Sequence, residues 1–189
     1  MTPQPAAKIE EILLLFNELA QLITPPSQFE LARLDTAIRN LCNVDTSLFQ
    51  CFRGLYYALQ GDLINTDKWF AMSICTEPTN PDIYMNYATA LVQLHQYDKA
   101  LKIALEGICK DSFNPKAVHN LLLSAYFADD RATIDEWLPK YEKLTGVAHE
   151  VAIWIQEDVE DDADIKSMRE RDIRKSSIDL NQLCKELGL

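Results

Sequence analysis

Three histidines are the residues of this sequence best suited to bind a metal or to carry acid–base chemistry. His95, His119 and His149 lie far apart along the chain, and none has a second histidine four positions away. A zinc pair on a helix requires that spacing, and the H-E-x-x-H motif requires a second histidine that His149 and Glu150 lack. The sequence therefore predicts no metal site, and we expect His95 to lie in a turn.

Five cysteines and one acidic run are the other candidates for redox chemistry or cation binding. The cysteines are odd in number and lack C-x-x-C spacing, which disfavours a zinc site, a redox motif or a disulfide framework. We expect them to be small buried apolar side chains. The run 157–164 holds six acids, but read as an EF-hand loop from Asp158 it has Ala163 and Arg169 where glycine and glutamate are needed. Nucleophile-elbow, phosphate-loop and dinucleotide motifs are also missing, so we predict no enzyme activity and no cofactor.

Charge and composition limit the classes of partner. The chain has 189 residues and a formal net charge of −11. Proteins that bind nucleic acid or anionic membranes carry a basic surface, so this charge argues against both classes of partner. The chain has 48% hydrophobic and 25% charged residues, as globular proteins do, and its five glycines favour a mostly helical fold. No segment has the pattern of a signal peptide or a membrane span, so we expect a cytoplasmic protein.

The elements that position these residues follow a period of 34. Asn80-Pro81 recurs as Asn114-Pro115 and Cys75 as Cys109, each 34 positions later, and the small residue Gly54 is matched at the same distance by the small residue Ala88. The period predicts repeats at 47–80, 81–114 and 115–146, each with two apolar-periodic helices joined by a polar turn. Pro81 and Pro115 mark the openings of first helices, because a proline there costs no hydrogen bond.

This pattern resembles the tetratricopeptide repeat (TPR) family. The best-matched repeat has large and small residues at the family's positions: Tyr84, Tyr87, Ala88, Leu91, Tyr97 and Ala100. Residues 13–46 fit as a degenerate repeat with Ala32 at a small position, and Pro139 is expected to kink or shorten the last second helix. The resemblance implies an all-α fold, a right-handed helical-repeat solenoid of TPR-like helix–turn–helix units with extra C-terminal helices.

Two segments follow the repeat domain, which we place at residues 1–146. Ala148–Gln156 is predicted to be a short apolar helix, with Trp154, that covers the exposed edge of the last repeat. Within residues 147–189, Leu180, Leu183, Cys184 and Leu187 form one apolar face of a final amphipathic helix. That helix either packs onto the repeats or docks on a partner.

The resemblance also implies a concave groove lined by the first helices. The residues expected to line it, largely apolar, are Leu55, Met85, Asn86, Thr89, Val92, Lys116, His119, Leu123, Tyr126 and Phe127. Tyr126 and Phe127 are the expected anchors, because aromatic residues dominate interface energetics. The alternative, left open here, is that such residues are buried against neighbouring helices. Asn86 and Lys116 occupy two places of the family's carboxylate clamp, whose other places are not matched.

Two functions from different classes fit these observations. The first is a non-enzymatic adaptor or chaperone-like module that binds a peptide or amphipathic helix of another protein in the groove. The second is a structural or assembly subunit whose groove is filled by its own C-terminal helix or by a second copy, as in a homodimer.

Overall fold

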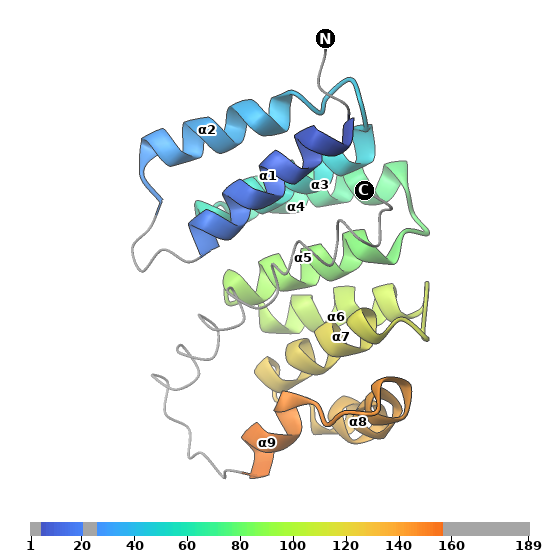
Figure 1. The fold of residues 1–189 in the computed structure, drawn as a ribbon. Helices are drawn as coiled ribbons and strands as arrows, with labels where there is room; N and C mark the ends of the chain where they lie inside the picture. Colours follow the sequence, from blue (N-terminus) through green and yellow to red (C-terminus); the bar gives the residue numbers. More distant parts are fainter. Residues whose placement is uncertain (1–4, 21–25, 157–189) are drawn as a thin grey trace. The chain divides into compact units, whose positions relative to one another are not determined.

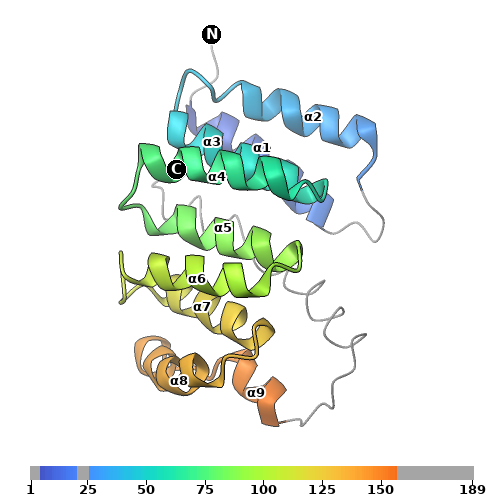
Figure 2. The same ribbon diagram turned by 180° about the vertical axis from the view of Figure 1, so that it is seen from behind.

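A computed structural model describes residues 5–20 and 26–156, and every regular element within these ranges is an α-helix (Figures 1 and 2). The helices are α1 (Pro5–Ala20), α2 (Gln28–Arg39), α3 (Thr46–Leu59), α4 (Leu63–Thr76), α5 (Pro81–Gln93), α6 (Tyr97–Ile108), α7 (Pro115–Phe127), α8 (Arg131–Thr145) and α9 (Glu150–Gln156). The prediction of an all-α fold is confirmed. The acidic run and the final amphipathic helix lie outside the described residues.

The helices form two compact units with their boundary between Thr76 and Glu77. Unit 1 contains α1 to α4, and unit 2 contains α5 to α9. Within unit 1, α1 packs on α2, α2 on α3, and α3 on α4. Within unit 2, α5 packs on both α6 and α7, and α7 packs on α6, α8 and α9.

Each of three predicted turns, between α3 and α4, α5 and α6, and α7 and α8, contains a residue in the left-handed backbone conformation. Gly61, His95 and Asp129 have φ values of 72°, 56° and 56°, and they recur with the same period of 34 as the sequence. Glycine adopts this conformation freely, whereas other residues adopt it much less often. The period therefore also holds for the backbone conformation, and His95 lies in a turn as expected.

Asparagine caps begin α5 and α7 in the same way. The side chain of Asn80 accepts a hydrogen bond from the backbone N–H of Asp82 at 3.0 Å, and Asn114 accepts one from Lys116 at 3.0 Å. Pro81 and Pro115 occupy the first helical turn, where a missing N–H leaves no hydrogen bond unmade. The repeated Asn-Pro pair thus starts both helices.

Small residues allow close contact within the helix pairs. Ala88 in α5 and Ala100 in α6 are both 0% exposed. In the pair α3 and α4, a Cβ added at Gly54 would lie only 2.6 Å from the Phe70 ring. This distance is well below van der Waals contact, so α3 and α4 can approach this closely only because residue 54 is a glycine.

One expectation for an individual residue is wrong, and a second, that Pro139 kinks or shortens its helix, is wrong for the shortening. Ala32, which the register places at a small buried position, is exposed on α2. Pro139 does not shorten its helix, because α8 continues to Thr145 and ends at Gly146, which has a φ of 75°. A left-handed glycine is a common end of a helix, so the stop signal is Gly146 and not the proline.

Candidate functional site

The paired first helices of unit 2 share a set of half-exposed residues. We call these residues the first-helix face: Asn86 and Thr89 on α5, and Lys116, His119, Asn120 and Tyr126 on α7. The two helices contact each other directly, while α6 packs against both of them and α8 against α7. All of these residues except Asn120 belong to the predicted groove, and Asn120 is added by the structure.

Four other predicted groove residues are part of the core of unit 2. Met85, Val92, Leu123 and Phe127 are 8%, 3%, 3% and 1% exposed. Phe127 stacks on Tyr97 of α6, with ring centroids 5.7 Å apart. A side chain buried in this way offers almost no surface to a partner, so Phe127 cannot serve as a surface anchor. Leu55 lies on α3 of unit 1 and packs against that unit's apolar core.

Hydrogen bonds tie the polar side chains of the face together. The Thr89 hydroxyl donates to the Asn120 side-chain oxygen at 2.8 Å, which links α5 to α7. The Asn120 amide nitrogen donates to the backbone oxygen of Lys116 at 3.1 Å. These bonds restrict the Asn120 amide to one orientation and make the centre of the face a defined polar surface.

A histidine pair joins α7 to the start of α9. The Nε2 of His149 lies 2.8 Å from Nδ1 of His119, and the backbone N–H of Val151 donates to Nδ1 of His149 at 3.1 Å. Because Nδ1 of neutral His149 is an acceptor, its proton is on Nε2, which donates to His119. The proton of neutral His119 is then on its own Nε2.

Burial keeps both histidines neutral. It lowers the pKa of His119 to about 4, and together with the nearby His119 it lowers the pKa of His149 to about 3. Burial also raises the pKa values of Tyr141 and Glu150, which lie beside this pair. One carboxylate oxygen of Glu150 is buried without a hydrogen-bond partner, so its ionised form is poorly solvated here.

An aromatic pair lies at the α9 edge of the face. Tyr126 and Trp154 have ring centroids 5.0 Å apart, and both side chains are half-exposed. The predicted short helix is present as α9, but Trp154 was not expected to reach a groove residue. No local sequence pattern links Trp154 to Tyr126, which lie 28 positions apart.

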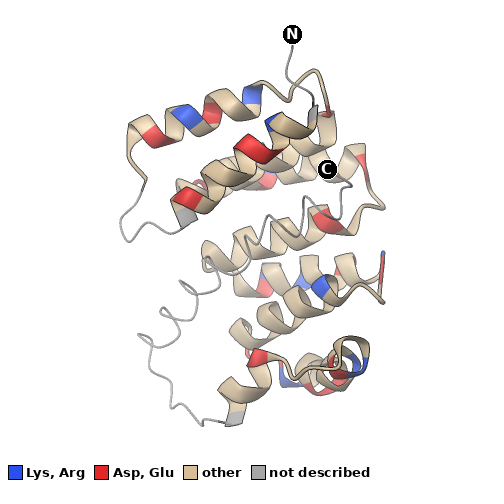
Figure 3. Cartoon of the chain, in the orientation of Figure 1, with Lys and Arg blue, Asp and Glu red and all other residues tan. Residues whose placement is uncertain are grey.

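Charged residues are scarce on the helices that carry the face. Asp82 is the one charged residue of α5 and Lys116 the one charged residue of α7, whereas α6 has four and α8 has six. Figure 3 shows α5 and α7 almost without charged positions. Apart from Lys116, the first-helix face therefore presents amide, hydroxyl, imidazole and aromatic groups.

Within residues 5–20 and 26–156, no group of three or more His, Cys, Asp or Glu could hold a metal ion. No helix in these ranges is long and apolar enough to cross a membrane. The chain matches no protein-family model and no curated protein.

Proposed function

We propose that this protein is a non-enzymatic interaction module, and that the first-helix face binds a segment of another protein. The observation that carries this proposal is that five of the six half-exposed residues of the first-helix face are uncharged, Lys116 being the exception. The centres of protein interfaces are depleted of charged residues and enriched in aromatic ones. The half-exposed Tyr126 and Trp154 fit the second criterion.

A TPR-like solenoid is the proposed scaffold. Its support is the pattern of helix contacts in unit 2: α5 packs on α6, both of these pack on α7, and α7 packs on α8. The regularly recurring left-handed turns and the matching Asn-Pro caps add to this support. Stacked repeats of this type align their first helices into an extended surface that is suited to binding a peptide or helix.

The chemistry of the face suggests a mixed partner segment. Tyr126 and Trp154 would contact an apolar or aromatic side chain, because both rings are partly accessible. Thr89, Asn120 and Asn86 lie on the more polar part of the face and suit backbone or amide groups. The predicted apolar groove is accordingly revised to a face that is polar on α5 and aromatic toward α9.

Substitution of Tyr126 tests this proposal. Full-length wild type and Tyr126→Glu are used as baits in the native host, and co-purifying proteins are identified by mass spectrometry. We expect one partner to be retained by wild type and lost by the variant, because a carboxylate would be placed beside the partner's apolar group. Leu105→Glu is the matched control, since Leu105 is 37% exposed on α6, away from the first-helix face. Equal retention by both variants, with unchanged circular dichroism, would contradict the proposal.

A structural or assembly subunit is the second candidate. The observation that favours it is that a segment of the chain itself, α9, already packs on α7 through His149 and Trp154. This function predicts a stable homodimer, or a face that gains a partner when residues 176–189 are deleted. Sedimentation of the full-length and deleted chains separates the two candidates, because a monomer whose partner binding is indifferent to the deletion excludes the second.

A further inference from the structure

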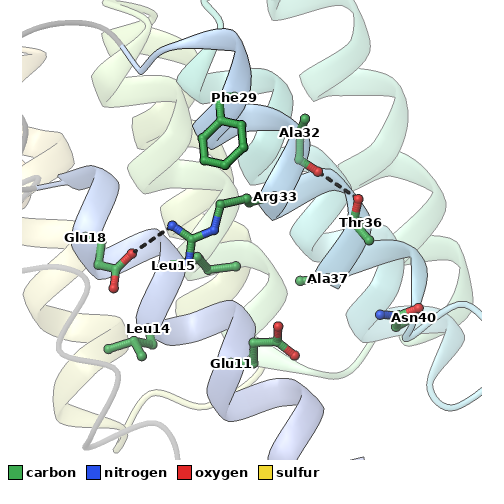
Figure 4. Close-up of a pocket in the computed structure, with 10 residues that line it drawn as sticks. All are labelled: Glu11, Leu14, Leu15, Glu18, Phe29, Ala32, Arg33, Thr36, Ala37 and Asn40. Atoms are coloured by element: carbon green, nitrogen blue, oxygen red, sulfur yellow. Dashed lines mark hydrogen bonds and ion pairs between the residues drawn. The ribbon is translucent and has the colours of Figure 1, made fainter.

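A pocket of about 420 Å³ lies between α1 and α2 of unit 1 (Figure 4). Leu15 and Ala37 are buried in its lining, 6% and 5% exposed. Leu14 and Phe29 lie at its rim and are 58% and 73% exposed, although both are large and apolar. Volumes of this size are typical of ligand sites, and grouped exposed apolar side chains mark surfaces that are covered by something else.

Polar groups around the pocket give it an acidic rim. Glu11 and Glu18 come from α1, and Arg33 comes from α2 (Figure 4). Arg33 forms an ion pair with Glu18 at 3.9 Å, with both side chains 52% exposed. A pair so long and so accessible is weak, and Glu11 is exposed and not neutralised by it. The rim therefore suits an apolar group that is flanked by positive charge.

We propose that this pocket is the docking site of residues 177–189 of the same chain. Leu180, Leu183, Cys184 and Leu187 have the i, i+3, i+4, i+7 spacing of one apolar helix face. Such a face requires an apolar surface to cover it, and the pocket between α1 and α2 offers one of matching character. This placement differs from occupation of the first-helix face, which it leaves open to a partner.

The length of the preceding segment permits this docking. Residues 157–179 separate α9 from the apolar stripe. Extended, this segment would span about 75 Å. The longest described helix, α1, is about 24 Å long at roughly 1.5 Å per residue. The length of residues 157–179 therefore allows residues 177–189 to bind to unit 1 as well as to unit 2.

Charge also favours this segment over an unspecified apolar peptide. Residues 166–175, which come shortly before the apolar stripe, hold five Lys or Arg against two acids, Glu170 and Asp172, a net charge of +3, and Lys185 lies beside the stripe. These cations are opposite in sign to Glu11 and Glu18 at the rim of the pocket.

Photo-crosslinking of the purified full-length chain tests the proposal. Phe29 is replaced by p-benzoylphenylalanine, and crosslinked peptides are mapped by mass spectrometry. We expect crosslinks to residues 177–189 in a product with the mass of one chain. The matched control has the same replacement at Phe113, which is 79% exposed but lies in unit 2, and should give no such crosslink.

Leu183→Glu provides the second arm of the experiment. It places a carboxylate in the centre of the apolar stripe, and we expect at least a tenfold loss of the crosslink from position 29. Crosslinks only in a product of doubled mass would overturn the proposal in favour of a second copy as the occupant. Absence of any crosslink to 177–189, or equal yield with Leu183→Glu, would also overturn it. No partner is needed, so failure here leaves the test of the first-helix face unaffected.

Discussion

The pair α5 and α6 in unit 2 and the pair α1 and α2 in unit 1 are both made of consecutive helices in contact, but they differ in how closely the helices approach. Ala88 and Ala100 are completely buried between α5 and α6. Ala32 of α2 is exposed instead and lines a pocket between α1 and α2. Small residues alone therefore do not close a helix pair, because they must also face each other.

The two units also stabilise buried polar groups differently. In unit 1, Arg53 is 8% exposed, forms an ion pair with Asp35, donates to the Tyr57 hydroxyl at 3.0 Å and lies 4.9 Å from the centre of the Tyr56 ring. In unit 2, the buried His149 is kept neutral and hydrogen-bonded to His119. Unit 1 buries a charge with its counter-charge, whereas the buried histidine pair of unit 2 is uncharged, which agrees with the proposed binding face.

The largest expected effect of a single substitution comes from the buried charge of unit 1. Asp35→Ala leaves the Arg53 guanidinium without its counter-charge, and we expect a loss of about 3 kcal/mol in the free energy of unfolding. Glu136→Ala breaks the exposed Lys140–Glu136 pair of α8 and should cost less than about 0.5 kcal/mol. Urea unfolding measures both variants, and equal losses would contradict this difference between the units.

Acid should affect unit 2 before unit 1. The pKa values of His119 and His149 are lowered in the folded protein, so the unfolded chain binds protons first as the pH falls. Their contribution is complete above about pH 6.5 and decreases below it, by about 2 kcal/mol per ring at pH 5. The pKa of Glu150 is raised in the folded protein, so its protonation favours folding as the pH falls and partly offsets this loss.

Hydrogen exchange at pH 7 and pH 5, corrected for intrinsic rates, should detect this loss as faster exchange in α7 and α9. His119→Gln should reduce the pH dependence. A change in α3 and α4 of the same size would show that the histidine pair is not its cause.

Added volume should separate the close helix pair from the open one. Ala88→Leu inserts three carbons where Ala88 is 0% exposed, and we expect it to cost at least about 1 kcal/mol. Ala32→Leu adds the same atoms beside the pocket of unit 1, and in a chain that ends before residue 177, which leaves the pocket open, it should be neutral or stabilising. Thermal unfolding of both variants in this shortened chain gives the comparison, and similar losses would contradict the difference between the two helix pairs.

The smallest expected effect concerns the attachment of α9. Trp154→Ala removes the ring that contacts Tyr126, and we expect a loss of about 1 kcal/mol together with a change in the NMR signals of His119. Ile153→Ala is the control, because Ile153 is 52% exposed on the same helix and should change stability by less than about 0.5 kcal/mol. Identical behaviour would mean that Trp154 does not hold α9 on α7.

Local signals made most of the fold predictable from the sequence. The Asn-Pro caps and the apolar periodicity placed α3 to α8 because these features depend on neighbouring residues. The burial of Phe127 was not predictable in this way, since Tyr126 and Phe127 are adjacent aromatics and only the packing of α6 distinguishes them. The His119–His149 contact joins residues far apart in the sequence, and the pocket depends on the gap between two helices. Neither has a signature in local sequence.

The most direct test of the central proposal is a hydrogen–deuterium exchange map of the full-length chain with and without the partner that it captures. Binding to the first-helix face predicts slower exchange in α5 and α7, with little change in α1 and α2. Slower exchange confined to α1 and α2 would contradict the proposal and assign partner binding to the pocket of unit 1.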